Sequence, residues 1–278
     1  MPPSLTPACR QAGVREGEGK LSTLPASGKE KLPIDFMKLF KYPILPALVL
    51  AVTAGGCATA FKTSPTYPQA IKEIRTIAVM PPDVDVYKVT AGGVVEKVDE
   101  WSAEAKGYIR EALKTHLSQR HDFEIKFIEE DWLKANHKTL WQANRELYYA
   151  VSLSALYHAY DGVAQFPTKR KSFEYTLGKE VKELADAAGA DALFFIYGLD
   201  HEDTAGRTAI KIFAALLTNT IIYSPSMMTM GLVNAKNGDL EWFVVSPAQT
   251  EYSFRSQKHI NTLVEWETRH FTKTDKKK

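Results

Sequence analysis

The stretch Gly189-Ala190-Asp191-Ala192-Leu193-Phe194-Phe195-Ile196-Tyr197-Gly198-Leu199 predicts the class of fold. Its second half is nearly all apolar, which is typical of a strand that is covered on both faces. Before it, apolar side chains recur at steps of three and four over residues 177–188, and Gly189 stands where a glycine commonly ends a helix. A helix that leads directly into a doubly buried strand predicts an α/β fold, in which helices flank a mixed β-sheet.

Similar patterns on either side of this stretch predict the remaining elements. Strands are expected at residues 72–80, 123–128, 192–199, 228–234 and 241–246, and Asn237-Gly238 is a strong signal for a hairpin turn between the last two. Helices are expected at residues 100–119, 133–160 and 259–271. The many aromatic side chains of 132–160 keep a helical period, which favours core packing over an aromatic binding groove.

Cys57 is the most informative single residue for function. A short positive start, Met37-Lys38-Leu39-Phe40-Lys41, precedes an apolar run at 44–52, and Ala54-Gly55-Gly56 supplies the small residues that a signal peptidase needs before the cysteine. The apolar run is too short to span a bilayer, which takes about 20 residues. This pattern predicts a lipoprotein signal peptide and a lipidated Cys57. The alternative is an apolar helix that ends in a buried thiol.

The signal divides the chain into five parts. Residues 1–36 show neither apolar period, so we expect them either to lie upstream of the true start at Met37 or to form a disordered segment. Residues 37–56 are the predicted signal peptide, 57–70 a lipidated tether kept extended by two prolines, and 71–272 a single α/β periplasmic domain. Residues 273–278 form a basic, solvated tail.

Charge and motifs argue against several classes of function. Residues 1–56 hold 7 of the 35 basic and 4 of the 33 acidic side chains, so the remaining residues carry a net charge of about −1, which does not favour nucleic acid. The sequence contains no phosphate-binding glycine loop, no Gly-x-Ser-x-Gly elbow, no His-Glu-x-x-His and no cysteine pair for zinc. The sequence therefore predicts no enzyme, no metal and no cofactor.

His201-Glu202-Asp203 is the only tight cluster of residue types that hydrolases or metal sites use. It directly follows a predicted strand, at the edge where open sheets often bind ligands. Adjacent residues of an extended chain point to opposite sides, however, so the three side chains are not expected to meet one substrate atom. An envelope hydrolase built on these residues stays an alternative.

An apolar run at 209–222, followed by a methionine-rich segment, is the second candidate site. Its spacing suits a helix, and it has two interpretations. It is either a core element, or a surface helix that docks on the bilayer or on a partner, since methionine is adaptable at such faces. The candidate surface residues are Phe213, Leu216, Leu217, Ile221, Ile222, Met227 and Met228.

Three segments carry a resemblance to a known family. They are Ile74-Arg75-Thr76-Ile77-Ala78-Val79-Met80-Pro81, the junction Gly189-Ala190-Asp191-Ala192-Leu193, and the hairpin from Gly231 to Trp242. Their order resembles periplasmic lipoproteins of the curli-secretion type and the amino-terminal domain of the TolB translocation protein, over residues 71–245. The resemblance implies the same fold and compartment, and no catalytic chemistry.

These observations lead to one main hypothesis. We expect a lipoprotein that is held by Cys57 at the periplasmic face of the outer membrane and acts as a non-catalytic assembly or accessory factor of an envelope or secretion complex. Its expected partners are the membrane, an envelope protein and possible further copies of itself. A secretion-channel subunit is the other alternative, although 131–160 and 209–222 both lack the strict alternation of barrel strands.

Overall fold

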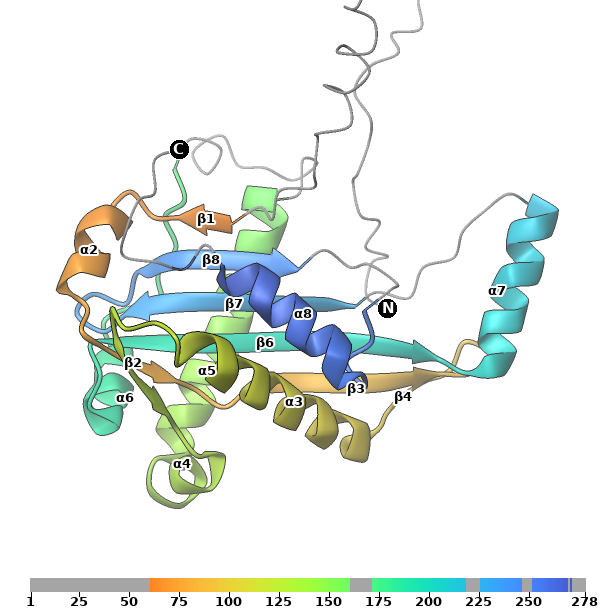
Figure 1. The fold of residues 1–278 in the computed structure, drawn as a ribbon, viewed down its shortest axis with the longest axis horizontal. Coiled ribbons are helices and arrows are strands. Elements are labelled where there is room, and N and C mark those ends of the chain that lie inside the picture. The colour runs from red at the N-terminus through yellow and green to blue at the C-terminus, as the bar shows by residue number, and fades with distance from the viewer. Residues whose placement is uncertain (1–60, 161–171, 219–225, 247–251, 270, 272–278) are drawn as a thin grey trace, which may run out of the picture. The chain divides into compact units, whose positions relative to one another are not determined.

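A mixed sheet forms the centre of the fold, as the sequence predicts (Figure 1). The computed structural model describes residues 61–160, 172–218, 226–246, 252–269 and 271. The sheet has eight strands in the order β1-β8-β7-β6-β2-β5, with β3 also paired to β6 and β4 to β3. The strands are β1 (Phe61–Thr63), β2 (Thr76–Val79), β3 (Asp83–Val89), β4 (Val95–Lys97), β5 (Glu124–Phe127), β6 (Ala192–Asp203), β7 (Met227–Asn234) and β8 (Leu240–Ser246).

Helices cover both faces of this sheet. The helices of the described region are α2 (Tyr67–Glu73), α3 (Asp99–Leu117), α4 (Glu130–Asn136), α5 (Lys138–Ala155) with a π-helical end at Leu156–Tyr160, α6 (Val181–Ala188), α7 (Ala205–Thr218), which stands off the end of the sheet, and α8 (Gln257–Thr268). In Figure 1, α3 and α8 lie in front of the sheet and α5 passes behind it. The described region is thus one α/β domain with a core layer on each side of the sheet.

The central strand β6 alternates between the two core layers. Ala192, Phe194 and Ile196 pack with α3 and α8, whereas Leu193 and Phe195 pack with α5 and α6. All five are at most 2% exposed. This double burial explains why nearly every residue in the first half of β6 is apolar. It confirms the predicted helix-flanked sheet.

The junction before β6 also follows the prediction. Gly189 ends α6 in the left-handed conformation, with φ of 61°. Two residues later, the Asp191 carboxylate accepts hydrogen bonds from the backbone N–H groups of Arg75 and Thr76, at 2.9 and 3.0 Å. Those bonds lower the pKa of Asp191 and tie the start of β2 to the start of β6.

The tether prediction is wrong for the described part of residues 57–70. Phe61 to Thr63 form β1, which pairs antiparallel with β8, and α2 begins at Tyr67. The buried Glu241 carboxylate accepts bonds from the hydroxyls of Ser64 and Thr66, and the Asn234 amide also donates to it at 3.1 Å. These contacts hold the segment on the sheet although its prolines suggest an extended chain.

Two further predictions about the strands need correction. The strands β3 and β4 are absent from the sequence-based assignment. Asp83–Val89 alternates polar and apolar residues as a strand does, but it directly follows two prolines, which indicate an end of pairing, and β4 has only three residues. The strand β6 is also longer than expected and ends at Asp203, because Tyr197 to Asp203 pair in parallel with β3. His201-Glu202-Asp203 therefore lies inside a paired strand rather than beyond its end.

Candidate functional site

Helix α7 follows directly on β6 and stands off the end of the sheet (Figure 1). The backbone N–H of Thr204 donates to the Val89 carbonyl at 3.0 Å, which fixes the turn between strand and helix. The Thr204 hydroxyl then accepts from the N–H of Arg207 at 3.3 Å, in the manner of a helix N-cap. The start of α7 is thus anchored to the sheet.

The apolar side of α7 faces outward. Exposed fractions are 45% for Ile210, 58% for Ile212, 64% for Phe213, 80% for Leu216 and 69% for Leu217. A surface helix of a globular domain normally turns this side toward the core. Five large apolar side chains in one helix at these exposures form an apolar surface rather than scattered surface residues.

The polar side of α7 faces inward instead. The Lys211 ammonium forms an ion pair with the Asp203 carboxylate, and their side chains are only 14% and 16% exposed. The helix is therefore inverted relative to an ordinary amphipathic surface helix.

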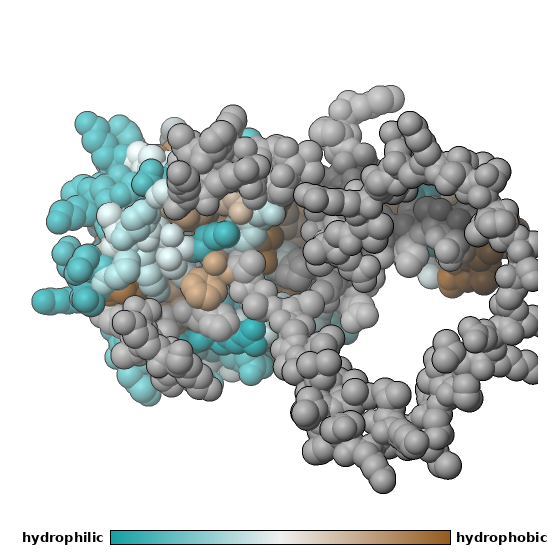
Figure 2. Space-filling view, turned by 90° about the horizontal axis from the view of Figure 1, so that it is seen from above, coloured by the Kyte–Doolittle hydropathy of each residue, from teal (hydrophilic) through white to brown (hydrophobic). Residues whose placement is uncertain are grey.

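The turn between β3 and β4 adjoins the first turn of α7. A Cβ atom placed on Gly206 would lie 3.3 Å from the Ala91 side chain, so the two backbones approach closely here. Val94 and Val95, at 56% and 50% exposed, add apolar surface beside this contact. Figure 2 shows apolar surface at the right of the view, where α7 lies in Figure 1. We call α7 with Val94 and Val95 the α7 surface.

The predicted surface residues fall into three groups. Phe213, Leu216 and Leu217 are exposed, so the core interpretation of this segment is wrong for them. Met228 is fully buried and Met227 is half-buried in β7, so the surface interpretation is wrong for Met228. Ile221, Ile222 and Cys57 lie outside the described residues.

The structure does not bring His201, Glu202 and Asp203 together. His201 stacks on Tyr87 of β3 with ring centroids 5.3 Å apart, and Asp203 on the same face of β6 pairs with Lys211. The Glu202 carboxylate, on the opposite face, accepts a hydrogen bond from the Ser253 hydroxyl. The alternation of the strand therefore separates the three candidate hydrolase residues.

A different pair of carboxylates does share one face of β6, namely Asp200 and Glu202. The side chain of Asp200 is 1% exposed and accepts hydrogen bonds from the Ser226 hydroxyl and from the Phe254 backbone N–H, the latter at 2.8 Å. Burial raises the pKa of Asp200 to about 6, although these two hydrogen bonds favour the charged form and lower the pKa. The two residues stand two positions apart, and in a strand this spacing indicates that their side chains share a face. Their hydrogen bonds to Ser253 and Phe254 tie the segment before α8 to β6.

The neighbouring Ser253 and His259 do not form a nucleophile with its base. The Ser253 hydroxyl donates to Glu202, while the His259 Nδ1 accepts the Ser253 backbone N–H at 3.2 Å. The imidazole is therefore bonded to the backbone of Ser253, not to its hydroxyl oxygen, as proton transfer would require.

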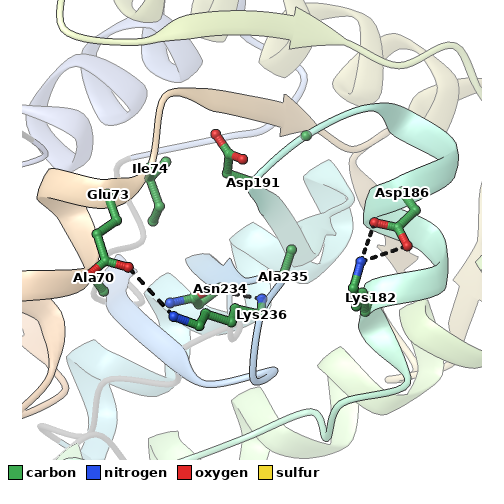
Figure 3. Close-up of a pocket in the computed structure, with 10 residues that line it drawn as sticks. Ala70, Glu73, Ile74, Lys182, Asp186, Asp191, Asn234, Ala235 and Lys236 are labelled. Atoms are coloured by element: carbon green, nitrogen blue, oxygen red, sulfur yellow. Dashed lines mark hydrogen bonds and ion pairs between the residues drawn. The ribbon is translucent and has the colours of Figure 1, made fainter.

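A shallow cavity of about 340 Å³ lies at the amino-terminal ends of β2 and β6 (Figure 3). Its charged side chains already pair with one another. Lys182 bonds to Asp186 at 2.6 Å, and Lys236 lies 3.9 Å from Glu73. Asp191 is bonded to backbone N–H groups, as described above. The cavity therefore presents charges that already pair with one another rather than a set of converging catalytic groups.

Two further properties of the described residues bear on function. No group of three or more histidine, cysteine or acidic residues could hold a metal ion there. In the same part of the chain, no helix combines the length and apolar character that crossing a membrane requires.

Comparisons with known proteins return only distant likeness. No family model and no curated protein matches the sequence. The structure resembles a PelC dodecamer from Paraburkholderia phytofirmans, with a TM-score of 0.31 and 7% identity over 75% of this chain and 91% of that chain. It also resembles the LpoB C-terminal domain from Salmonella enterica, with a TM-score of 0.25 and 11% identity over 74% of this chain and 94% of that chain. Likeness at this level carries no argument about function, so the function is argued from the chain's own residues.

Proposed function

We propose that the chain is a lipoprotein, anchored through Cys57 at the periplasmic face of the outer membrane, that acts by binding as a non-catalytic accessory factor of an envelope complex. The observation that carries this proposal is the inverted helix α7. A helix that turns Lys211 inward and Leu216 outward exposes apolar area to water, which is unfavourable unless something covers it.

The lipid anchor is supported by the sequence alone. The positive start, short apolar run and small residues before Cys57 are the parts of a lipoprotein signal, with Ala54 at the position where such signals usually carry leucine. One acyl chain binds a membrane only weakly, whereas two or more anchor a protein stably. The resemblance to sorted lipoproteins, with Ala58 after the cysteine, favours the outer membrane.

A binding role fits the polar residues of the domain better than catalysis does. His201 and Asp203 lie on the opposite face of β6 from Glu202, and each of the three contacts the fold itself. Replacing all three with alanine is therefore expected to remove structural contacts and to leave no specific hydrolytic defect.

Metabolic labelling with radioactive palmitate tests the anchor. The wild-type chain should incorporate label and fractionate with the outer membrane, whereas Cys57→Ser should do neither. Cys9→Ser is the matched control, because Cys9 is the only other cysteine, and it should label normally. Equal labelling of the wild type and Cys57→Ser, or fractionation with the inner membrane, would remove the basis of the proposal.

A further inference from the structure

We infer that the α7 surface docks on a phospholipid bilayer, as a second contact beside the lipid on Cys57. This inference rests on the proposed function and names the partner of the same surface. A bilayer is preferred to a protein partner because of the arrangement of side chains around α7, the absence of acidic residues in the helix, and the place of the anchor relative to its exposed end.

Apolar side chains occupy a wide, continuous arc of α7. At about 100° per residue, the arc from Ile212 round to Ile210 covers about 160° and contains only apolar residues or glycine. Arg207 and Lys211 lie on the opposite side, toward the sheet. This division gives α7 a side that hydrocarbon can cover while its charged side chains stay against the sheet.

A protein partner fits this arc less well. Protein interfaces carry about one hydrogen bond per 100–200 Å², and they use polar groups at the rim to set orientation. The side chains of the arc offer no donor or acceptor. A pair of α7 helices from two copies would bury only a narrow seam, and the arc is wider than such a seam. Hydrocarbon, by contrast, requires no hydrogen-bond partner from the helix.

Charge also favours a lipid surface. The helix contains no aspartate or glutamate, so it does not repel anionic headgroups. Its exposed fractions rise toward the carboxyl-terminal end, from 45% at Ile210 to 80% at Leu216. The side chains that would enter the lipid are therefore gathered near one end of the helix.

An acylated Cys57 and the carboxyl-terminal end of α7 can lie at the same bilayer surface. Cys57 precedes Phe61 by four residues, which span at most about 14 Å, so an acylated Cys57 keeps β1 close to the bilayer. The strand β1 is the outermost strand on its side of the sheet. In Figure 1, α7 rises from the level of β6 past β7 and β8 to the level of β1. A bilayer beside the β1 edge would therefore also meet the carboxyl-terminal end of α7.

Vesicle flotation of the mature chain, residues 57–278, carrying Cys57→Ser separates this contact from the lipid anchor and from the apolar run at 44–52. The vesicles contain phosphatidylethanolamine and phosphatidylglycerol. The chain should float with them, and the further change Leu216→Glu should reduce binding about tenfold or more, because a charge then enters the lipid face. Leu147→Glu is the matched control, since Leu147 on α5 is also an exposed leucine, at 39%, and it should bind as the parent chain does.

Hydrogen exchange gives a second measurement that does not depend on a charged substitution. The full chain with Cys9→Ser has Cys57 as its one thiol, which can be coupled to a maleimide lipid in the same vesicles. Amides of α7 should exchange more slowly on the vesicles than in buffer, while amides of α5 should not change.

Three outcomes would overturn the inference. The first is that the chain does not float with the vesicles and that hydrogen exchange in α7 is unchanged on them. The second is that the Leu216→Glu and Leu147→Glu variants bind the vesicles equally well. The third is that the chain forms an oligomer without lipid and that Leu216→Glu dissociates it. The last outcome would assign the α7 surface to a second copy. In each case the proposed function survives if palmitate labelling at Cys57 holds and the α7 surface is covered in native membranes, so the two failures are distinguishable.

Discussion

Lys211 in α7 forms an ion pair with Asp203, the last residue of β6, and this contact sets the face that the helix presents to its surroundings. Both side chains are more than four-fifths buried at the junction. The pair therefore holds the polar side of α7 against the sheet and leaves Phe213, Leu216 and Leu217 outside. Asp203 thus has a structural role in place of the catalytic role considered from the sequence.

Removing either partner of this pair should loosen α7. We expect Asp203→Asn and Lys211→Met each to cost about 2 kcal/mol of local stability, because the remaining charge is left partly buried. Hydrogen exchange of α7 amides measures this local opening, and a double-mutant cycle isolates the coupling. The pair Lys182 and Asp186 is the control, since both side chains are more than half exposed, and its cycle should give at most about 0.5 kcal/mol. Equal coupling in the two pairs would contradict this role.

Asp200 should make the stability of the domain depend on pH. Its pKa is raised to about 6 in the folded protein because of burial, against about 4 in an unfolded chain. Between these values the folded protein keeps a proton that the unfolded chain releases. The free energy of unfolding should therefore fall as pH rises from about 4 to 6, by roughly 2–3 kcal/mol. Below about pH 4 both states are protonated, and this contribution to the pH dependence vanishes.

Comparison with Asp200→Asn isolates this contribution. The variant has one acceptor oxygen in place of the two that accept from the Ser226 hydroxyl and the Phe254 backbone N–H, and it is expected to be less stable. The measured quantity is therefore the slope of stability against pH rather than its absolute value. The difference in free energy of unfolding between wild type and variant should itself change across the window. A constant difference from pH 4 to 7 would show that Asp200 does not titrate there.

Glu267 in α8 should destabilise the folded state. Its side chain is fully buried, and burial raises its pKa well above the usual range. The Ser246 side chain is the one group that lowers this pKa, and the Ser246 hydroxyl already donates to the Met228 carbonyl at 3.1 Å. We expect Glu267→Met to raise the free energy of unfolding by about 1–2 kcal/mol. Glu265→Met, on the exposed side of the same helix, should have almost no effect. A loss of stability in Glu267→Met alone would reveal a partner for the carboxyl group.

Gly231 in β7 should not tolerate a side chain. A Cβ atom there would lie 2.8 Å from the Leu240 side chain and 2.9 Å from the Tyr148 ring, so packing must shift to admit it. We expect Gly231→Ala to lower the free energy of unfolding by about 1–3 kcal/mol. Gly107→Ala is the opposite control, because nothing lies within 4 Å of its Cβ position in α3, and it should stabilise the helix by about 1 kcal/mol. Equal effects of both changes in thermal unfolding would contradict this packing.

The elements with strong periodicity were predictable from the sequence. The burial of β6 on both faces, the amphipathic face of α3 and the left-handed Gly189 each leave a local signal, and the structure confirms all three. The strand β3 has the alternation of a half-buried strand, but Pro81-Pro82 just before it indicates an end of pairing, and its pairing with a distant part of β6 leaves no local pattern. The strand β4 has only three residues, all of them exposed. Long-range pairing of this kind is not encoded in a local pattern.

The candidate site likewise has one feature that the sequence predicts and one that it does not. The sequence identifies an apolar helix near residues 209–222, but not which way it faces, because its orientation depends on the ion pair between Lys211 and Asp203. Similarly, Met228 belongs to the apolar segment in sequence and to the core in space, since β7 pairs with β6 at Gly198. Only tertiary contacts separate exposed Leu216 from buried Met228.

Thiol labelling in native membranes tests the central claim most directly, that the outward face of α7 is covered when the lipidated chain is in place. The lipidated chain with Cys9→Ser carries Leu216→Cys or, as the control, Leu147→Cys, and acylation blocks the sulfur of Cys57. Leu216→Cys should react about tenfold or more slowly in membranes than in the unlipidated Cys57→Ser chain in buffer, whereas Leu147→Cys should react equally in both. Equally fast labelling of Leu216→Cys in membranes and in buffer would contradict the account.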